Sequence, residues 1–304
     1  MPARLRLPDA PTLHLERQFN GPVCGIDEAG VAPLAGPVVA AAVRLHTASK
    51  PRALRGLNDS KLLTAGERDR FFDIIHEIAS VGVGMASVSE IDTLNIHHAN
   101  LRAMQRAFEA LSERPGRALI DGHARPTLDC DVETVIKGDR RSLSIAAASV
   151  IAKVTRDRIM HELAADFPDY GWDTNVGYGT DVHYLGLLRK GPTAHHRRSF
   201  APLETIFAPM ATASRAFRFV RIEDAVNPAR VELFFLRNDL HAVFDGDGRH
   251  LGVLKNVRGG WRFKAIGYDS DGHPTEAAGP CAAAHGARLA GPDRSALSRL
   301  LSDA

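Results

Sequence analysis

Along residues 21–170, short apolar runs alternate with segments whose apolar residues have helical spacing, and this predicts alternating strands and helices. Between residues 21 and 45, two apolar runs flank a segment rich in Gly and Pro, which predicts a strand, a turn and a second strand. Further strands are expected at Val81–Val88, 118–122 and Val132–Ile136. Helical spacing predicts helices at Arg68–Ile78, with Ser60 as a capping residue, at Ile96–Leu111 and at Ser144–Ala165. This order predicts an α/β domain built on a mixed sheet.

The pattern changes near residue 208. Residues 208–214 are typical of a linker, and strand-like runs follow at Arg230–Leu236, Leu240–Phe244, Leu251–Leu254 and Trp261–Ile266. Asp245-Gly-Asp-Gly predicts a hairpin turn; it resembles the start of a calcium loop, but no Glu stands where such a loop requires one. Arg294–Leu301 is expected to form a short helix. We therefore expect two domains, 1–207 and 208–304. The second is a small β-rich module of unknown role, with Trp261 and Phe263 in its core.

Composition narrows the class of protein. The 304 residues are 44% hydrophobic and 24% charged, as in an ordinary globular protein. Apolar runs such as Val38–Val43 are too short to cross a bilayer, and the N-terminus lacks the pattern of a signal peptide. The three cysteines, Cys24, Cys130 and Cys281, are widely spaced and odd in number, so we expect no disulfide framework and a cytoplasmic location.

Charge adds little at this stage. The net charge is +2, and residues 208–304 hold 13 Lys and Arg against 11 Asp and Glu, which is no strong signature of nucleic-acid binding. A basic cluster at residues 189–198 is interpreted as a solvated loop, with a nucleic-acid contact as the alternative. It contains Arg189, Lys190, His195, His196, Arg197 and Arg198.

Four carboxylates stand at the ends of predicted strands: Asp27, Glu28, Asp121 and Asp139. Converging carboxylates repel one another unless cations lie between them, and Mg²⁺ or Mn²⁺ suits an all-oxygen site. Two such ions, roughly 3.5–4 Å apart, can activate a water and stabilise a leaving oxygen. Taken singly, each Asp can equally be a turn or capping residue. Adjacent residues of a strand face opposite ways, so Asp27 and Glu28 are expected to share a site only if the strand breaks at Glu28.

The order of motifs carries a resemblance to a known family. Gly25-Ile-Asp-Glu-Ala-Gly and Pro33-Leu-Ala-Gly-Pro closely resemble the opening motif of bacterial ribonuclease HII. Later blocks follow in the same order: Leu57-Asn-Asp-Ser-Lys-Leu, Ile91-Asp-Thr-Leu-Asn-Ile, Ile120-Asp-Gly, Lys137-Gly-Asp, the helix from Ser144, Gly177-Tyr-Gly-Thr, His183 and His196-Arg-Arg-Ser-Phe. The resemblance spans residues 21–203.

This resemblance implies an RNase H-like fold and a metal site made by the four carboxylates, with Mn²⁺ or Mg²⁺ as cofactor and two ions expected. Asp27 and Asp139 would be the most direct ligands, and Glu28 and Asp121 would complete the site. The implied reaction is hydrolysis of the RNA strand of an RNA·DNA hybrid by a metal-activated water, which leaves 3′-hydroxyl and 5′-phosphate ends. His183 and His196 are expected to be structural. The family also suggests a monomer.

Substrate recognition is where this chain departs from the family. A ribonuclease of this kind must sense the 2′-hydroxyl of the substrate. In the family, a Gly-Arg-Gly turn and the Tyr of a Lys-Gly-Tyr-Gly block hold the ribonucleotide for this purpose. This chain keeps Gly30 and Tyr178 but has Val31 and Ala32 in the turn. Val176 replaces the Lys, so two cations are lost. Lys61 remains a predicted phosphate contact; Lys153 and Arg197 are weaker candidates for phosphate or structural contacts.

The sequence leaves three functions open. The first is a nuclease that cuts hybrids and also ribonucleotides embedded in duplex DNA. The second is a metal-bearing but catalytically weak nucleic-acid-binding protein, which could act through residues 208–304 or a protein partner bound there. The third is a nuclease that needs several consecutive ribonucleotides.

Overall fold

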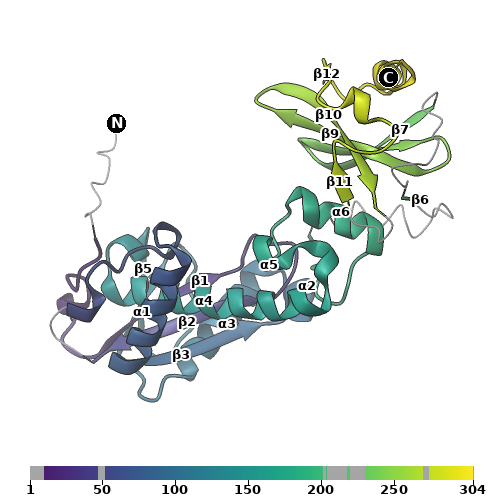
Figure 1. Cartoon of the computed structure of the whole chain (residues 1–304). Coiled ribbons are helices and arrows are strands. Elements are labelled where there is room, and N and C mark those ends of the chain that lie inside the picture. Colours follow the sequence, from purple (N-terminus) through teal and green to yellow (C-terminus); the bar gives the residue numbers. More distant parts are fainter. Residues whose placement is uncertain are drawn as a thin grey trace, which may run out of the picture. The chain divides into compact units, whose positions relative to one another are not determined.

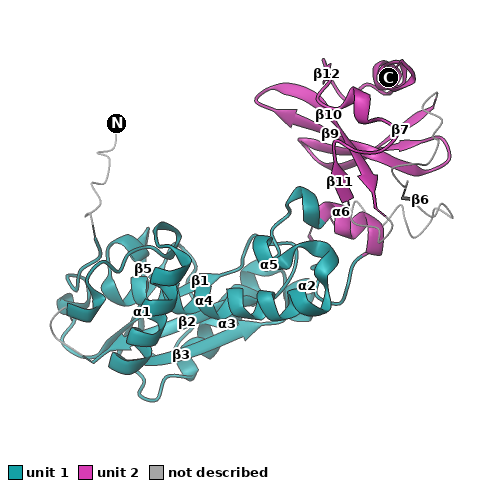
Figure 2. Cartoon of the chain, viewed as in Figure 1, with its two compact units in different colours: residues 1–183, 192–199 teal, residues 184–191, 200–304 magenta. Residues whose placement is uncertain are grey.

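The computed structural model describes residues 10–46, 52–200, 203, 218–219, 230–269 and 274–303 (Figure 1). The chain forms two compact units, residues 1–183 with 192–199 and residues 184–191 with 200–304 (Figure 2). The domain boundary expected at residue 207 stays a prediction. The expected linker at 208–214 lies outside the described residues.

The first unit is built on a five-stranded sheet with the strand order β3-β2-β1-β4-β5. The strands are β1 (Val23–Ala29), β2 (Val38–Leu45), β3 (Ala79–Ala86), β4 (Arg117–Asp121) and β5 (Asp131–Val135). The pairs β1–β2 and β2–β3 are antiparallel, whereas β1–β4 and β4–β5 are parallel. The expected mixed sheet is therefore confirmed. Because β1 and β4 run in the same direction, Asp27 and Asp121 reach the same edge of the sheet.

Helices cover both faces of this sheet (Figure 1). Those that pack on the strands are α1 (Ala65–Ile78), α3 (Ile96–Glu109) and α4 (Leu143–Asp166). The unit also contains α2 (Val88–Leu94), α5 (Trp172–Asn175) and the first residues of α6 (Asp181–Lys190). A Cβ at Gly25 would lie 2.2 Å from the backbone nitrogen of Ile145, so α4 lies directly on β1 at a residue that must be glycine. A Cβ at Gly84 would meet the backbone of α3 in the same way. The helices α4 and α3 therefore pack on opposite faces.

Two predicted boundaries are wrong, and both errors concern capping. Helix α1 is capped by Thr64, whose hydroxyl accepts from the Glu67 N–H while the Glu67 carboxylate accepts from the Thr64 N–H. Ser60 instead begins a short 3₁₀ helix, η3 (Ser60–Leu62). Strand β3 ends at Ala86, because Ser87 and Glu90 form a second capping box that starts α2. The short helices α2, α5 and α6 were not predicted.

The second unit is a mainly antiparallel β structure followed by a C-terminal helix, with one parallel pair, β6–β9. Its main strands follow the path β11-β10-β9-β8-β7, with β12 paired to β10 and β6 to β9. They are β6 (Arg218–Phe219), β7 (Val231–Arg237), β8 (Leu240–Asp245), β9 (Arg249–Val257), β10 (Gly260–Tyr268), β11 (Pro274–Glu276) and β12 (Arg288–Leu289), followed by α8 (Arg294–Ser302). The expected strands, the hairpin at Asp245 and the terminal helix are confirmed. Phe263 is fully buried in the core, and Trp261 packs against it.

Two further expectations can be compared with the described part of the chain. No helix there is both long enough and apolar enough to cross a membrane. Cys24, Cys130 and Cys281 are free thiols, so the expectation of no disulfide is met by all three cysteines. The cytoplasmic location stays a prediction.

Candidate active site

All four predicted carboxylates line one cavity of about 370 Å³ in the first unit. Asp27 and Glu28 come from the end of β1, Asp121 from the end of β4, and Asp139 from the short 3₁₀ helix η4 (Gly138–Arg140). Asp27 and Asp139 are buried, with exposed fractions of 6% and 9%. The parallel pairing that places Ile26 beside Ile120 brings the next residues, Asp27 and Asp121, side by side. The fold therefore gathers carboxylates that the sequence scatters over more than a hundred residues.

Asp27 and Glu28 reach the cavity from opposite faces of the sheet. The expected break of the strand at Glu28 is wrong, because β1 continues to Ala29 and Glu28 pairs with Ala40. The hydroxyl of Ser149, on α4, stabilises the Asp27 carboxylate, whereas the side chain of Asn100, on α3, stabilises Glu28. The cavity lies at the end of β1, so it can be lined from both faces at once.

The charges in this cavity are poorly balanced. Burial, Glu28 and Asp121 raise the pKa of Asp27 well above its ordinary value. Burial and Asp121 raise the pKa of Glu28, and burial with Asp121 and Asp59 raises that of Asp139 to about 6. Lys61 acts in the opposite direction on Glu28 and Asp139 but does not offset these effects. The cavity thus favours an added positive charge.

The carboxylates do not form a closed coordination sphere in this structure. Within the described ranges, no group of three or more His, Cys, Asp or Glu side chains is arranged to hold a metal ion. Asp121 Oδ1 accepts a hydrogen bond from the Gly138 N–H at 2.6 Å, and Asp27 Oδ1 accepts from the Glu28 N–H at 2.8 Å. Because the carboxylates repel one another, their side chains are favoured to point toward backbone N–H donors. The donor set, four carboxylates with hard oxygen atoms, nevertheless fits Mg²⁺ or Mn²⁺ in chemistry.

Two buried arginines fix the loop that follows Asp27 and Glu28. Arg197, fully buried, donates to the carbonyl oxygens of residues 30, 31, 36 and 37 at 2.5–3.2 Å. Arg156, 1% exposed, donates to those of residues 35, 37 and 176 at 2.9–3.1 Å. Burial and the nearby Arg156 lower the pKa of Arg197 to about 9. The interpretation of residues 189–198 as one solvated loop is therefore wrong for His196 and Arg197.

The predicted substrate residues lie around the same cavity. Gly30, Val31, Ala32, Lys61 and Tyr178 all line it. Tyr178 is 45% exposed, and Lys153 also lines the cavity while paired with Asp157 at 2.7 Å. A Cβ at Gly30, where φ is +94°, would lie 2.0 Å from Arg156 Nε. Ala32 does not have a left-handed backbone, and within the turn 30–32 a positive φ is found at Gly30 alone. Sequence reasoning missed Ser149, Asn100 and Arg156 as residues of the site.

A chain of hydrogen bonds links two buried histidines to Tyr178. His183 Nδ1 donates to the Tyr178 carbonyl at 3.0 Å, and its Nε2 accepts from Trp172 Nε1 at 3.1 Å. His196 Nδ1 accepts from the Thr193 N–H at 2.9 Å, which leaves its Nε2–H to donate to His183 Nε2 at 3.0 Å. We assign these tautomers from the network. Both rings are neutral in this assignment, and their burial and hydrogen bonds agree with the expected structural role.

Acid should destabilise this network. Burial, opposed by the bond to Tyr178, lowers the pKa of His183 to about 4; burial and His183 lower that of His196 to about 3. Since the unfolded side chains titrate near 6.5, the unfolded chain binds more protons below that pH. Stability from this pair is full above pH 6.5 and is lost as pH falls toward 4 and 3. At pH 5 we expect a loss of about 2 kcal/mol per histidine, measured by urea denaturation.

The variant His196→Asn isolates this contribution, because an amide oxygen can still accept from Thr193 and does not titrate. Its loss of stability between pH 7 and pH 5 should be clearly smaller than that of the unmodified chain. The raised carboxyl pKa values change stability with pH in the opposite direction. Both proteins share this contribution, so the comparison removes it. An equal loss in both proteins would contradict the assigned neutral network.

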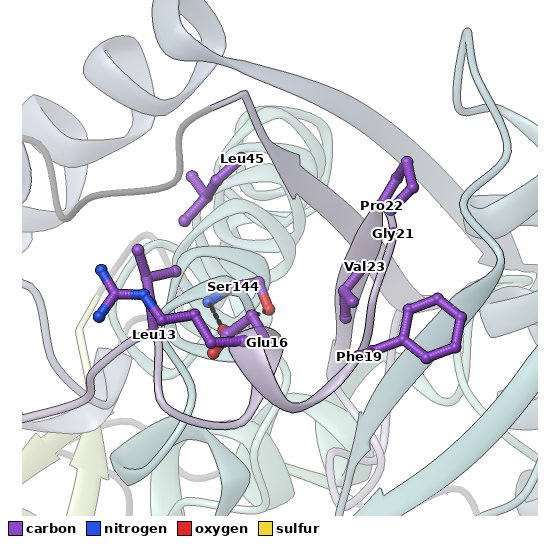
Figure 3. Close-up of a pocket in the computed structure, with 9 residues that line it drawn as sticks. Leu13, Glu16, Phe19, Gly21, Pro22, Val23, Leu45 and Ser144 are labelled. Carbon is purple, nitrogen blue, oxygen red and sulfur yellow. Dashed lines mark hydrogen bonds between the residues drawn. The ribbon is translucent and has the colours of Figure 1, made fainter.

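A second cavity, of about 290 Å³, lies at the start of α4 (Figure 3). Its lining contains one carboxylate, Glu16, whose Oε1 accepts from the backbone and hydroxyl of Ser144 and from the hydroxyl of Ser142 at 2.6–2.9 Å. A negative charge at this position stabilises the positive end of the helix dipole. Glu16 therefore anchors the helix that carries Ser149 and Arg156 to the active site, and this cavity offers no second cluster of metal ligands.

Comparison with known proteins gives one consistent family. The sequence profile of the ribonuclease HII family matches residues 24–203. Ribonuclease HII of Paramagnetospirillum magneticum is 52% identical over 194 residues, which are 64% of this chain and 96% of that protein. The Jannaschia sp. enzyme is 51% identical over 197 residues, 64% of this chain and 98% of that protein.

The fold comparison agrees with the expected RNase H-like architecture. The crystal structure of ribonuclease H2 from Pyrococcus horikoshii OT3 matches with a TM-score of 0.54 and 23% identity, covering 63% of this chain and 100% of that one. The family match ends at residue 203, so the β strands of the second unit lie outside it. Within the match lie all four carboxylates, and the chain belongs to the ribonuclease HII family of endonucleases.

Proposed function

We propose that this chain is a divalent-metal-dependent endoribonuclease that hydrolyses the RNA strand of RNA·DNA hybrids and leaves 3′-hydroxyl and 5′-phosphate ends. The observation that carries this proposal is the convergence of Asp27, Glu28, Asp121 and Asp139 on one cavity in a member of the ribonuclease HII family. The competing function, a catalytically weak nucleic-acid-binding protein, has no comparable support in the site, because all four carboxylates are present.

The four carboxylates would hold Mg²⁺ or Mn²⁺ and orient it against the scissile phosphate. When bound, the metal supplies activation of a water and stabilisation of the leaving oxygen. Ser149 and Asn100 orient Asp27 and Glu28 from the two faces of the sheet. Lys61 adds a positive charge at the cavity, where it can contact the phosphate. The buried arginines keep the loop 30–37 in place beside these groups.

Selection of ribose over deoxyribose would fall to the residues at the rim. The exposed ring of Tyr178 can lie against the sugar, and its carbonyl is fixed by His183. The backbone at Gly30–Ala32 can approach the substrate without a side-chain cation. A duplex with one embedded ribonucleotide offers a single 2′-hydroxyl, so we propose that it is cut more slowly than a continuous hybrid.

Restoring one cation tests this selectivity. Val176 has φ of 42° and ψ of 37°, a left-handed conformation that is especially unfavourable for a β-branched residue. Val176→Lys should raise the free energy of unfolding by roughly 0.5–1 kcal/mol, lower KM for the embedded ribonucleotide and steepen its salt dependence. Val176→Gly is the matched control: it relieves the strain without adding charge, so KM should not fall. A lower KM in both variants would exclude a charge effect.

The proposed function is tested with the full chain, Mn²⁺ or Mg²⁺, and two labelled duplexes. One duplex contains a single ribonucleotide in DNA, and the other is a continuous RNA·DNA hybrid. We expect metal-dependent cutting of the hybrid with 5′-phosphate products. Absence of cutting on both duplexes would overturn the proposal in favour of a binding protein. Cutting of the hybrid alone would identify a nuclease that needs consecutive ribonucleotides.

A further inference from the structure

A row of cations crosses three strands of the second unit. In the register of the sheet, Lys255 of β9 pairs with Arg262 of β10, and Arg262 pairs with Arg288 of β12. Neighbouring strands lie about 4.8 Å apart, so the row spans roughly 10 Å. We call Arg258, Lys255, Arg262 and Arg288 the cationic face. The nearly neutral composition of residues 208–304 conceals this alignment.

The side chains of Lys255, Arg262 and Arg288 lie on the face of the sheet that does not form the central core, and Arg258 stands in the turn between β9 and β10. Phe263 and Ala265 of β10 belong to that core, and Trp261 packs against it. Because side chains alternate along a strand, Arg262 and Lys264 lie on the other face. The strands β9, β10 and β12 contain five cationic residues and no Asp or Glu. Of the five, Lys264 pairs with Glu276 of β11 at 2.6 Å, and Arg249 lies 3.9 Å from the carboxylates of Asp245 and Asp247.

Like charges directly opposite one another in a sheet are destabilising. Among the described residues, neither Arg262 nor Arg288 has an ion pair that would compensate this repulsion. Arg258 adds a further cost, since it has φ of 52° in the β9–β10 turn, where Asn or Gly is favoured. Three arginines are therefore held at positions that the fold alone does not favour, which points to an anionic ligand.

The cationic face borders a groove of about 670 Å³. Arg258, Arg262 and Arg288 line it, together with Gly259 and Gly260, which leave the backbone accessible. Apolar groups also line it: Val257 is 39% exposed, and Trp261 and Leu289 are partly buried against the core. The groove is thus lined by three arginines beside two glycines, which suits the phosphate groups of a polymer.

We propose that the cationic face binds the phosphate backbone of a nucleic-acid duplex, the hybrid that the first unit is proposed to cut. This inference rests on the proposed function for the identity of the duplex. Arginine forks match phosphate oxygens in geometry and charge. Two linked binding surfaces on one chain also raise the effective concentration of the duplex at the catalytic unit.

A duplex fits better than an acidic protein or a single strand. A protein interface needs large aromatic or aliphatic anchors, and among the residues that line this groove Val257 is the one exposed large apolar side chain. A single strand is held by bases stacked on exposed aromatic rings, and Trp261 packs against the core instead. The cationic face can therefore contact the phosphates of a duplex and not its bases. We expect such binding to depend strongly on salt and little on the nucleotide sequence.

The test compares Arg262→Gln/Arg288→Gln with Arg294→Gln/Arg299→Gln in the full chain. The control pair is exposed on α8, which packs on the core face through Leu297 and Leu301, and removes the same charge. Binding of a labelled RNA·DNA hybrid is measured from about 50 to 200 mM salt in Mg²⁺, in an Asp27→Asn background that keeps the duplex intact. We expect about tenfold or greater weakening near 0.1 M salt and a salt slope smaller by about 1.8 for the cationic-face pair alone.

Folding and activity are read separately. The cationic-face pair should melt at the same or a higher temperature, because repulsion is relieved. With Asp27 intact, its KM for the hybrid should rise while kcat stays unchanged. Equal affinity and salt slope in the two pairs would overturn the inference and leave the proposed nuclease activity standing. Weaker binding by the cationic-face pair in a chain that cuts no duplex would support the surface and refute the proposed activity.

Discussion

Asp27→Asn should abolish metal-dependent cleavage, by at least about 10³-fold in kcat, while making the protein harder to unfold. Asp27 is 6% exposed, and its charged form is opposed by burial, Glu28 and Asp121. The neutral amide removes this repulsion and a metal ligand together, so Tm should rise as activity disappears. The two effects are measured by single-turnover cleavage of the hybrid and by thermal melting. Such opposite changes are expected where a site is kept strained for its function.

A matched control separates the site from general charge effects. Asp131 begins β5 with an exposed side chain and does not line the cavity, so Asp131→Asn changes the same chemical group by the same amount. It should leave kcat and Tm nearly unchanged. Cleavage retained by Asp27→Asn would refute the assigned metal site. A lower Tm in that variant would show that Asp27 is stabilised by its surroundings rather than repelled by them.

The strands and carboxylates of the first unit could be predicted because both leave local traces. Each carboxylate follows an apolar run, and the ordered motifs make the set recognisable as a whole. The sequence did not predict that Glu28 stays within the strand and still reaches the cavity. There Asn100 stabilises Glu28, while Ser149 stabilises Asp27 from a helix packed on the opposite face of the sheet. Neither residue differs in local pattern from an ordinary helical polar residue.

The capping errors have a related cause. Ser60 and Thr64 are both suitable N-cap residues, and only Thr64 has a Glu three positions later, at Glu67, to complete a capping box. Ser60 is used elsewhere, where its hydroxyl bonds to that of Ser149 at 2.8 Å, 89 residues away. Such long-range partners are invisible to periodicity. The register that aligns Lys255, Arg262 and Arg288 is equally hidden, since it follows from strand pairing.

Arg197→Met should cost more than about 3 kcal/mol in the free energy of unfolding, which is large for a residue that no charge pattern distinguishes from its neighbours. The guanidinium bonds four backbone carbonyls of the loop 30–37, and a buried acceptor left unsatisfied costs about 1–3 kcal/mol. Methionine fills similar space without any donor. Because that loop borders Asp27 and Glu28, kcat for the hybrid should also fall, measured on protein that remains folded at low temperature.

Arg198→Met is the control, since Arg198 is adjacent and exposed, and its backbone N–H, which Met keeps, donates to Asp92. It should change stability by less than about 0.5 kcal/mol. Similar losses in both variants, measured by urea denaturation, would mean that the lost charge matters and the carbonyl contacts do not. A large loss for Arg197 alone, with KM less affected than kcat, places this arginine as a positioning residue for the loop. Its family motif, His196-Arg-Arg-Ser-Phe, would then act on the fold of the active site rather than on the substrate.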